Sequence, residues 1–177
     1  MTSFETARLI CQPLTLRDYA SFESGVEPLW DGFTNPNKHL TEGPNPLCHR
    51  IPKVKKEPKF AEIGLILAIL KSTREVIGSA GFHDFPNEKG MIEIGFAIVP
   101  EKQNQGFGVE LLIGAWKMIC KQPDVKILRY TVSPKNATSL HIINKLGFKK
   151  VGEQIDPDDG LELIYEKSVE EFLLTGL

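Results

Sequence analysis

A polar loop with two glycines separates a strand-like segment from a helix-like segment in the run VPEKQNQGFGVE, residues 99–110. Pro100 ends the apolar strand pattern, and a helical pattern begins at Gly106. The first backbone N–H groups of such a helix have no intrahelical acceptor, and the helix dipole adds positive potential at the same end. Gly106 and Gly108 let the chain turn and let a pyrophosphate approach the backbone closely. The spacing therefore predicts an anion-binding loop.

Two familiar phosphate-binding loops do not fit this spacing. No Gly-Lys-Ser/Thr follows, so the segment is not a P-loop, and no third glycine completes the pattern G-x-G-x-x-G. Two alternatives stay open at this point. One is an unrelated nucleotide-binding α+β domain that uses the same glycines for another pyrophosphate, and the other is a helix start whose glycines serve only a turn.

Hydrophobic periodicity and the placement of Pro and Gly predict the elements that position this loop. The predicted strands are residues 7–14, 65–71, 76–83, 91–99, 126–132, 148–155 and 161–167. The predicted helices are residues 15–26, a short piece around 29–33, 106–121, 136–146 and a short tail helix. Tight turns separate the three strands between residues 65 and 99, so we expect an antiparallel meander there. The order β-α-α-β-β-β-α-β-α-β-β predicts an α+β fold.

Capping residues mark the helix ends. Thr15 and Asp18 match a capping box, Asn136 caps the later helix, and Gly147 stands at the C′ position of that helix. Residues 35–58 contain five prolines and a basic cluster, and they predict a long irregular connection with room for a short helix. We see no repeat or second domain, so the sequence predicts a single domain over residues 1–177.

The composition is that of an ordinary globular protein. The 177 residues are 41% hydrophobic and 25% charged, which suffices for a core without disulfide or metal support. Lys and Arg number 21 against 23 Asp and Glu, and the net charge of -2 predicts no nucleic-acid or membrane partner. Three cysteines and four scattered histidines fit a reducing compartment and predict no metal site. Without a bilayer-spanning apolar run or a secretion signal, we expect a cytoplasmic protein.

The polar loop resembles the acetyl-CoA signature of the GNAT superfamily, Q/R-x-x-G-x-G/A. Gln103, Gly106 and Gly108 fall on the positions of that signature. A later stretch, Asn136-Ala137-Thr138-Ser139 followed by Lys145-Leu146-Gly147-Phe148, is similar to the same family's N-x-x-S…K-L-G-F motif. Two motifs in the right order, on the predicted elements, make the resemblance specific.

The resemblance covers most of the chain outside residues 35–58. Thr6-Ala7-Arg8-Leu9-Ile10 and Glu93-Ile94-Gly95-Phe96 look like the RimJ/RimL-like branch. The resemblance implies a GNAT fold, in which helices flank a mixed, mostly antiparallel sheet. It also implies an acetyl-CoA-dependent N-acetyltransferase in which a primary amine attacks directly in a ternary complex. The alternative is an acyl-CoA-binding module that has lost catalysis.

The implied cofactor site joins the loop to two strands. The strand over 94–99 would splay from the strand over 126–132 and hold the pantetheine arm, and backbone donors near the thioester would stabilise the tetrahedral intermediate. A well-paired central strand without a gap is the alternative, and capping alone is enough to explain Asn136. The implied acetyl-CoA-binding residues are Phe96, Ile98, Gln103, Gln105, Gly106, Phe107, Gly108, Val109 and Asn136.

Two residues are candidates for proton transfer. The attacking amine must be neutral, and Glu93 is the candidate base because it lies on the strand beside the implied thioester. Its alternative is a solvent-facing strand residue. Many family members place a tyrosine before L-G-F as the acid for the departing thiolate, and Ile143 occupies that position here. Ser139 matches the serine of RimL-type members and is the candidate acid, or else only a first-turn helix residue.

The acceptor site of this fold lies between the first two helices and the last hairpin. Trp30 on the helical side and Asp156 on the hairpin are the candidate acceptor-binding residues, because an acidic, aromatic-lined mouth attracts a cationic amine. A core position for Trp30 and an ordinary turn at Asp156 are the alternatives. The acceptor is expected to be a protein N-terminus or a small-molecule amine, and the protein a monomer or a homodimer.

Overall fold

The computed structural model describes residues 3–42 and 45–176. They form two compact units, the first made of the described residues up to His83 with Phe96–Ala115, and the second of Asp84–Gly95 with the described residues from Trp116 onwards. Strand β5 (Met91–Ile98) begins in the second unit and ends in the first, and helix α4 (Phe107–Ile119) begins in the first unit and ends in the second. The loop between β5 and α4 belongs to the first unit.

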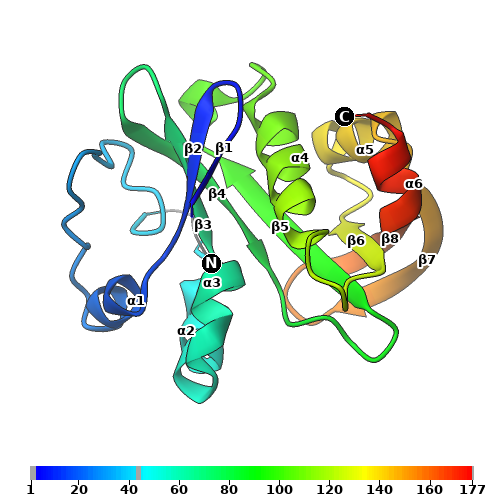
Figure 1. Ribbon diagram of the computed structural model, residues 1–177, viewed down its shortest axis with the longest axis horizontal. Helices are drawn as coiled ribbons and strands as arrows, with labels where there is room; N and C mark the ends of the chain where they lie inside the picture. The colour runs from blue at the N-terminus through cyan, green and yellow to red at the C-terminus, as the bar shows by residue number, and fades with distance from the viewer. Residues whose placement is uncertain (1–2, 43–44, 177) are drawn as a thin grey trace. The chain divides into compact units, whose positions relative to one another are not determined.

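Four antiparallel strands form the sheet of the first unit, in the order β1-β2-β3-β4 (Figure 1). They span Phe4–Glu5, Leu9–Pro13, Ile66–Leu70 and Glu75–Phe82. All five residues of β3 are buried, as its continuous apolar sequence predicts. The strand predicted over 7–14 is β2, and the sequence pattern did not predict β1, which precedes it. The chain reverses between the two strands, where the Thr6 N–H donates to the Leu9 carbonyl at 2.9 Å.

Helix α1 (Leu16–Glu23) begins at the predicted capping box. Thr15 Oγ1 accepts the Asp18 N–H at 3.2 Å, and the Asp18 carboxylate accepts the Thr15 N–H at 2.7 Å. Each residue thereby satisfies a backbone donor of the other. The helix ends before the predicted Val26, and Gly25 follows with a φ of +76°, which glycine adopts without strain.

The second helix lies elsewhere than predicted. Residues 29–33 are not helical. Helix α2 (Leu47–Lys56) lies instead inside the stretch predicted as irregular, and η1 (Pro58–Phe60) and α3 (Ala61–Gly64) follow it. Figure 1 shows α2, in cyan, beside α1, in blue. Residues 43 and 44 of the same stretch lie outside the described residues.

The sequence pattern did not predict α2 because a proline lies inside it. Leu47, Ile51 and Val54 recur at helical spacing, and α2 buries Leu47 and Val54. Pro52 stands inside the helix and cannot donate the backbone hydrogen bond of an interior position, so it signals a break. Burial of the apolar side chains outweighs the missing hydrogen bond, and the helix forms despite the signal.

The second unit also contains four strands, in the order β5-β6-β8-β7. Strand β6 spans Ile127–Val132, β7 spans Lys149–Asp156 and β8 spans Gly160–Ser168. Strands β5 and β6 are parallel, with Met91 opposite Ile127, whereas β6 with β8 and β8 with β7 are antiparallel. The predicted α+β class with a mixed, mostly antiparallel arrangement is confirmed.

An aromatic cluster lies in the core of the second unit. The Trp116 ring, in the last turns of α4, stacks on Phe148 at 4.6 Å and meets the edge of Phe172 at 5.8 Å between centroids. Phe148 directly precedes β7, and Phe172 lies in the tail helix α6 (Val169–Leu174). Helix α5 (Ala137–Lys145) begins at the predicted cap, where Asn136 Oδ1 accepts the Ser139 N–H at 3.0 Å.

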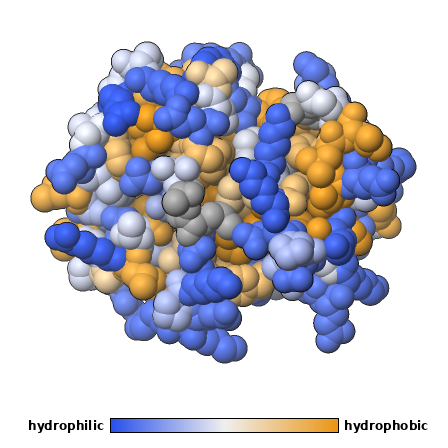
Figure 2. All heavy atoms as spheres, viewed as in Figure 1, coloured by the Kyte–Doolittle hydropathy of each residue, from blue (hydrophilic) through white to orange (hydrophobic). Residues whose placement is uncertain are grey.

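Hydrophilic side chains cover most of the face seen in Figure 2. An orange, apolar area lies over α6, where the side chains of Leu173 and Leu174 are exposed. Among the helices of the described residues, none has both the length and the apolar sequence needed to cross a membrane.

A buried histidine links a turn to β4 in the first unit. His39 Nε2 lies 2.8 Å from the Ser79 hydroxyl, and both side chains are buried. Asn35 holds the turn, because its Oδ1 accepts the His39 N–H at 2.9 Å and its Nδ2 donates to the His39 carbonyl at 3.0 Å. Burial disfavours the charged imidazolium and lowers the pKa of His39 to about 4.

This lowered pKa predicts a loss of stability in mild acid. Well above pH 6.5 the histidine is neutral in both states, so it contributes no pH dependence there. As the pH falls from 6.5 towards 4, the unfolded chain binds a proton that the folded chain does not, and the free energy of unfolding falls by about 3 kcal/mol. Denaturant titrations across this range should show a shallower fall for His39→Gln. The exposed His141 gives the control: His141→Gln should follow the wild-type profile, and a parallel His39→Gln profile contradicts the prediction.

Candidate functional site

The predicted anion-binding loop connects β5 to α4 as expected. A short 3-10 turn, η2 (Pro100–Lys102), follows β5, and α4 begins at Phe107. The Glu110 N–H donates to the Gly106 carbonyl at 3.1 Å as an i to i−4 bond. The N–H groups of Phe107, Gly108 and Val109 precede that bond and have no intrahelical acceptor, so they form the donor end of the helix. This is the arrangement that binds phosphate.

The two glutamines of the loop bond back to the backbone. Gln103 Nε2 donates to the Ile98 carbonyl at 2.8 Å, and Gln105 Nε2 donates to the Glu101 carbonyl at 3.1 Å. Asn104, between them, has a φ of +58°, in the left-handed region that asparagine tolerates. Both predicted cofactor-binding glutamine side chains therefore fix the shape of the loop.

The two glycines of the loop are required for different reasons. Gly106 has a φ of +81°, which an L side chain rarely adopts. A Cβ on Gly108 would lie 2.7 Å from Cε2 of Phe96, so this glycine makes room for an aromatic ring of β5. The structure thus brings together two predicted site residues, Phe96 and Gly108, by packing. The close approach of a pyrophosphate remains a prediction.

Glu110, in the first turn of α4, was not among the predicted site residues. Its carboxylate accepts hydrogen bonds from the Thr6 hydroxyl at 2.6 Å, the Arg8 N–H at 2.7 Å and Arg8 Nε at 2.6 Å. Burial alone would raise the pKa of this carboxyl, but the hydrogen bonds and the charge of Arg8 outweigh it and lower the pKa. The partners are 102 and 104 positions away, so no local pattern signals the contact.

The candidate base lies on a polar face of the second unit. Glu93 on β5 is half-buried, and its Oε1 accepts a hydrogen bond from the Thr131 hydroxyl of β6 at 2.6 Å. Arg129 lies opposite Glu93 in the register of these strands, and its Nε donates to Glu166 at 2.8 Å. The half-buried Glu93 still has access to solvent, and the neighbouring strand fixes the orientation of its carboxylate, so both interpretations of this residue stay open.

The candidate acid has a buried tyrosine as its partner. The Tyr130 hydroxyl of β6 donates to the Ser139 hydroxyl at 3.3 Å, and both residues are buried. Burial raises the pKa of Tyr130, and the Ser139 contact offsets part of that rise. The α5 position at which many family members have a tyrosine holds the fully buried Ile143. The tyrosine hydroxyl that contacts Ser139 comes instead from β6. The sequence held one signal for it, the strand alternation that makes Tyr130 inward-facing.

Strand β6 separates the two predicted proton-transfer residues. Tyr130 and Thr131 are neighbours in the strand, so their side chains point to opposite faces. Glu93, bonded to Thr131, therefore lies on one face, and Ser139, bonded to Tyr130, lies on the other. The structure does not bring Glu93 and Ser139 side by side.

The predicted acceptor residues each have structural contacts. Trp30 Nε1 donates to Asp18 Oδ1 at 3.0 Å, and its ring stacks on Phe33 at 5.2 Å between centroids. Asp156 Oδ1 accepts the N–H groups of Asp158 and Asp159 at 2.8 and 2.9 Å, which shapes the hairpin turn. Trp30 therefore makes the contacts of a packed aromatic residue, and Asp156 makes those of a turn residue.

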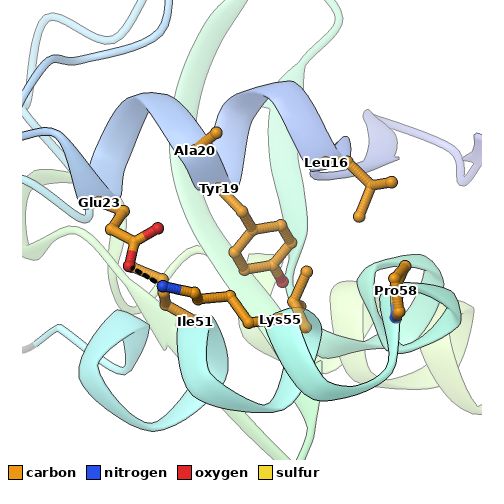
Figure 3. Close-up of a pocket in the computed structure, with 8 residues that line it drawn as sticks. Leu16, Tyr19, Ala20, Glu23, Ile51, Lys55 and Pro58 are labelled. Carbon is orange, nitrogen blue, oxygen red and sulfur yellow. Dashed lines mark hydrogen bonds and ion pairs between the residues drawn. The ribbon is translucent and has the colours of Figure 1, made fainter.

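A hollow of about 200 Å³ lies between α1 and α2 (Figure 3). Figure 3 shows the Tyr19 ring in the hollow, beside an ion pair between Glu23 and Lys55. The two charged atoms are 2.8 Å apart, so Lys55 pairs with an acidic residue of the helical side. The hollow is lined by Leu16, Tyr19, Ala20, Glu23, Ile51, Val54, Lys55 and Pro58. Across residues 3–42 and 45–176, no group of three or more His, Cys, Asp or Glu side chains could hold a metal ion.

Comparison with known proteins gives consistent matches. The family model described as an acetyltransferase (GNAT) domain matches residues 8–149. A relative from Bacillus licheniformis, the uncharacterized N-acetyltransferase p20, is 31% identical over 84 residues, which are 48% of this chain and 47% of the relative. The chain thus spans about half the length of the curated relatives that it matches.

Two solved structures show the fold alone, because their sequence identity is low. The ribosomal-protein-S5-alanine acetyltransferase of Vibrio fischeri has a TM-score of 0.68 at 15% identity and covers 97% of this chain and 99% of its own. Mutant forms of the spermidine/spermine N-acetyltransferase SpeG of Vibrio cholerae have a TM-score of 0.68 at 13% identity, with the same two coverages.

The contact between Gly108 and Phe96 predicts that Gly108→Ala destabilises the protein. Helix propensity alone would make alanine better by about 1 kcal/mol. The added Cβ instead meets the Phe96 ring, and overpacking of this kind costs about 1–3 kcal/mol. We expect a lower free energy of unfolding for Gly108→Ala and partial recovery in the double variant with Phe96→Leu.

The matched control is Gly152→Ala in β7, where the nearest atom would be 3.9 Å from the new Cβ and φ is not positive. Its unfolding free energy should stay close to that of the wild type. Equal effects of the two glycine substitutions in denaturant titrations would show that Phe96 does not restrict position 108.

Proposed function

The chain belongs to the acetyltransferase (GNAT) domain family, and we propose that it transfers an acetyl group from acetyl-CoA to a primary amine. The observation that carries this proposal is the loop from Ile98 to Phe107, which presents the donor end of α4 as a phosphate site. The N–H groups of Phe107, Gly108 and Val109 would bond the pyrophosphate. Backbone groups near Phe96 and the Asn136 side chain would bond the pantetheine arm.

We assign the whole chain, residues 1–177, to one catalytic domain of the RimJ/RimL-like branch. The segments Thr6–Ile10 and Glu93–Phe96 support the branch assignment. The cysteines Cys11, Cys48 and Cys120 are free thiols, which fits a cytoplasmic protein. A monomer or a homodimer is consistent with this assignment.

The reaction begins with loss of a proton from the acceptor. An ammonium has no lone pair, so Glu93 accepts the proton, directly or through a water, and the neutral nitrogen attacks the thioester carbonyl in a ternary complex. The Thr131 hydroxyl donates to Glu93 Oε1 and holds the carboxylate in one orientation. Backbone N–H groups at the carbonyl oxygen stabilise the tetrahedral intermediate.

The second step breaks the carbon–sulfur bond. The positively charged nitrogen of the intermediate releases a proton to water, the intermediate collapses to the amide and a thiolate, and the thiolate takes a proton from the Ser139 hydroxyl. Tyr130 donates a hydrogen bond to the Ser139 oxygen and stabilises the negative charge that forms there, until the proton released by the nitrogen returns to Ser139 through water. A thiolate is a comparatively good leaving group, with a thiol pKa of about 8.5, so this assistance is worth less than that of the base.

The proposed acceptor is a protein N-terminus or a small-molecule amine. The names of the two structurally similar enzymes contain one acceptor of each kind, a ribosomal protein and a polyamine. Trp30 and Asp156 are the proposed acceptor contacts, through exposed parts of side chains that also make the internal contacts described above. A screen of peptides, polyamines and amino acids with acetyl-CoA, followed by release of free thiol, tests the activity. Binding of acetyl-CoA without thiol release would favour an inactive acyl-CoA-binding module.

We predict that Glu93→Gln lowers kcat/KM near neutral pH by roughly 100-fold, as expected for loss of a positioned general base. Affinity for acetyl-CoA, measured by calorimetry, should not change. The control is Glu153→Gln, an exposed strand carboxylate paired with Lys150, which should keep full activity. Normal turnover by Glu93→Gln would assign the base to another group.

We predict that Ser139→Ala and Tyr130→Phe lower kcat and kcat/KM together, by about 10-fold, because the interaction forms only in the transition state. Tyr165→Phe removes a hydroxyl from the residue opposite Tyr130 in β8 and should leave both constants unchanged. Normal turnover of Ser139→Ala with a lower melting temperature would show that Ser139 serves only the helix.

A further inference from the structure

The Arg8 side chain contacts the end of the loop before α4 and the first turn of α4. Its Nε donates to Glu110 at 2.6 Å, and its Nη1 donates to the Gln105 carbonyl at 2.9 Å. The guanidinium carbon lies 4.1 Å from the centroid of the Phe107 ring. A Cβ on Gly106 would lie 3.4 Å from Nη2, so the planar group rests against the glycine of the loop. One side chain from outside the loop thus contacts three consecutive residues, from Gln105 to Phe107.

The contact with Gln105 sets the direction of a backbone donor. In a trans peptide the C=O of one residue and the N–H of the next point in opposite directions. The Gln105 carbonyl points towards Arg8, so the Gly106 N–H points away from Arg8. If Arg8 is lost, this peptide can rotate, because Gly106 tolerates many backbone conformations. Arg8 therefore fixes the orientation of the Gly106 N–H, which directly precedes the three N–H groups of the donor end of α4.

Arg8 also compensates a charge that is unfavourable for phosphate. The Glu110 carboxylate lies in the first turn of α4, and its side chain is only 15% exposed. An unpaired carboxylate there would repel a bound pyrophosphate, whereas the ion pair with Arg8 removes most of its field. The positive end of the helix and its N–H groups then determine the local potential.

We propose that Arg8, held in place by Glu110, is a positioning residue for the phosphate-binding loop and acts on affinity for the pyrophosphate part of the donor. The inference rests on the proposed acetyl-CoA function. It adds a role for the N-terminal segment, which sets the donor geometry of a loop about a hundred residues later. A merely structural role would tie the segment to α4 without affecting donor recognition.

A pair of donors separates these roles. Acetyl-CoA carries the pyrophosphate, and S-acetylpantetheine carries the same thioester without it. Arg8→Gln should raise the KM for acetyl-CoA by roughly 10-fold, the loss expected when a charge-assisted hydrogen bond is removed, with little change in kcat. The wild-type preference for acetyl-CoA over S-acetylpantetheine, as a ratio of kcat/KM values, should fall by the same factor.

Arg74→Gln is the matched control. Arg74 is also in the first unit, and its Nε donates to the Gly32 carbonyl at 2.9 Å, so the same substitution removes a similar bond away from the loop. It should leave the donor preference unchanged. Arg8→Lys keeps the charge but lacks the planar fork that bridges two acceptors, so it should lose part of the preference. This variant also serves if Arg8→Gln does not fold.

Two results would overturn the inference alone. One is an Arg8→Gln or Arg8→Lys enzyme with the wild-type donor preference, and the other is an equal loss with both donors accompanied by a lower melting temperature. A wild-type enzyme that does not distinguish acetyl-CoA from S-acetylpantetheine would instead reject the phosphate site of the proposed function. The inference would then fail with it.

Discussion

The proposed chemistry depends on holding the first turn of α4 in one position. A helix start with unsatisfied N–H groups binds an anion only if those groups already point at it. Three contacts within the first unit supply that constraint. Phe96 packs against the helix where Gly108 leaves space, Gln103 ties the loop back to β5, and Glu110 ties the helix to the N-terminal segment. Two of these contacts involve β5 and the third involves the N-terminal segment, so the position of the turn is fixed without a ligand.

The two residues proposed for proton transfer lie on opposite faces of one strand in the second unit. Glu93 with Thr131 lies on one face of β6, and Ser139 with Tyr130 lies on the other. A base and an acid on opposite faces do not neutralise each other, which suits a reaction that removes a proton from the nucleophile and adds one to the leaving group. Both can serve a single carbonyl only if it lies level with the strands and not over one face.

Local chemistry predicts much of this fold, and long-range contacts account for what it misses. Thr15 with Asp18 and Asn136 are read directly as caps, because each bonds to its own helix. The polar loop between β5 and α4 was also predicted from its own residues. Helix α2 was missed because it is short, so few apolar residues recur at helical spacing, and because Pro52 interrupts that pattern. The Arg8–Glu110 contact was missed because nothing in the sequence near either residue requires the other.

Several acidic side chains of the first unit have partners, and this affects how the protein can attract a cationic acceptor. The sequence suggested an acidic mouth, but Glu23, one of the acidic residues on the helical side, pairs with Lys55 at 2.8 Å. The Glu27 carboxylate accepts a hydrogen bond from Asn35. Paired surface charges create only a weak field beyond about 10 Å at physiological salt. A cationic amine would therefore gain little from long-range attraction to this unit, and recognition has to come from direct contacts at short range.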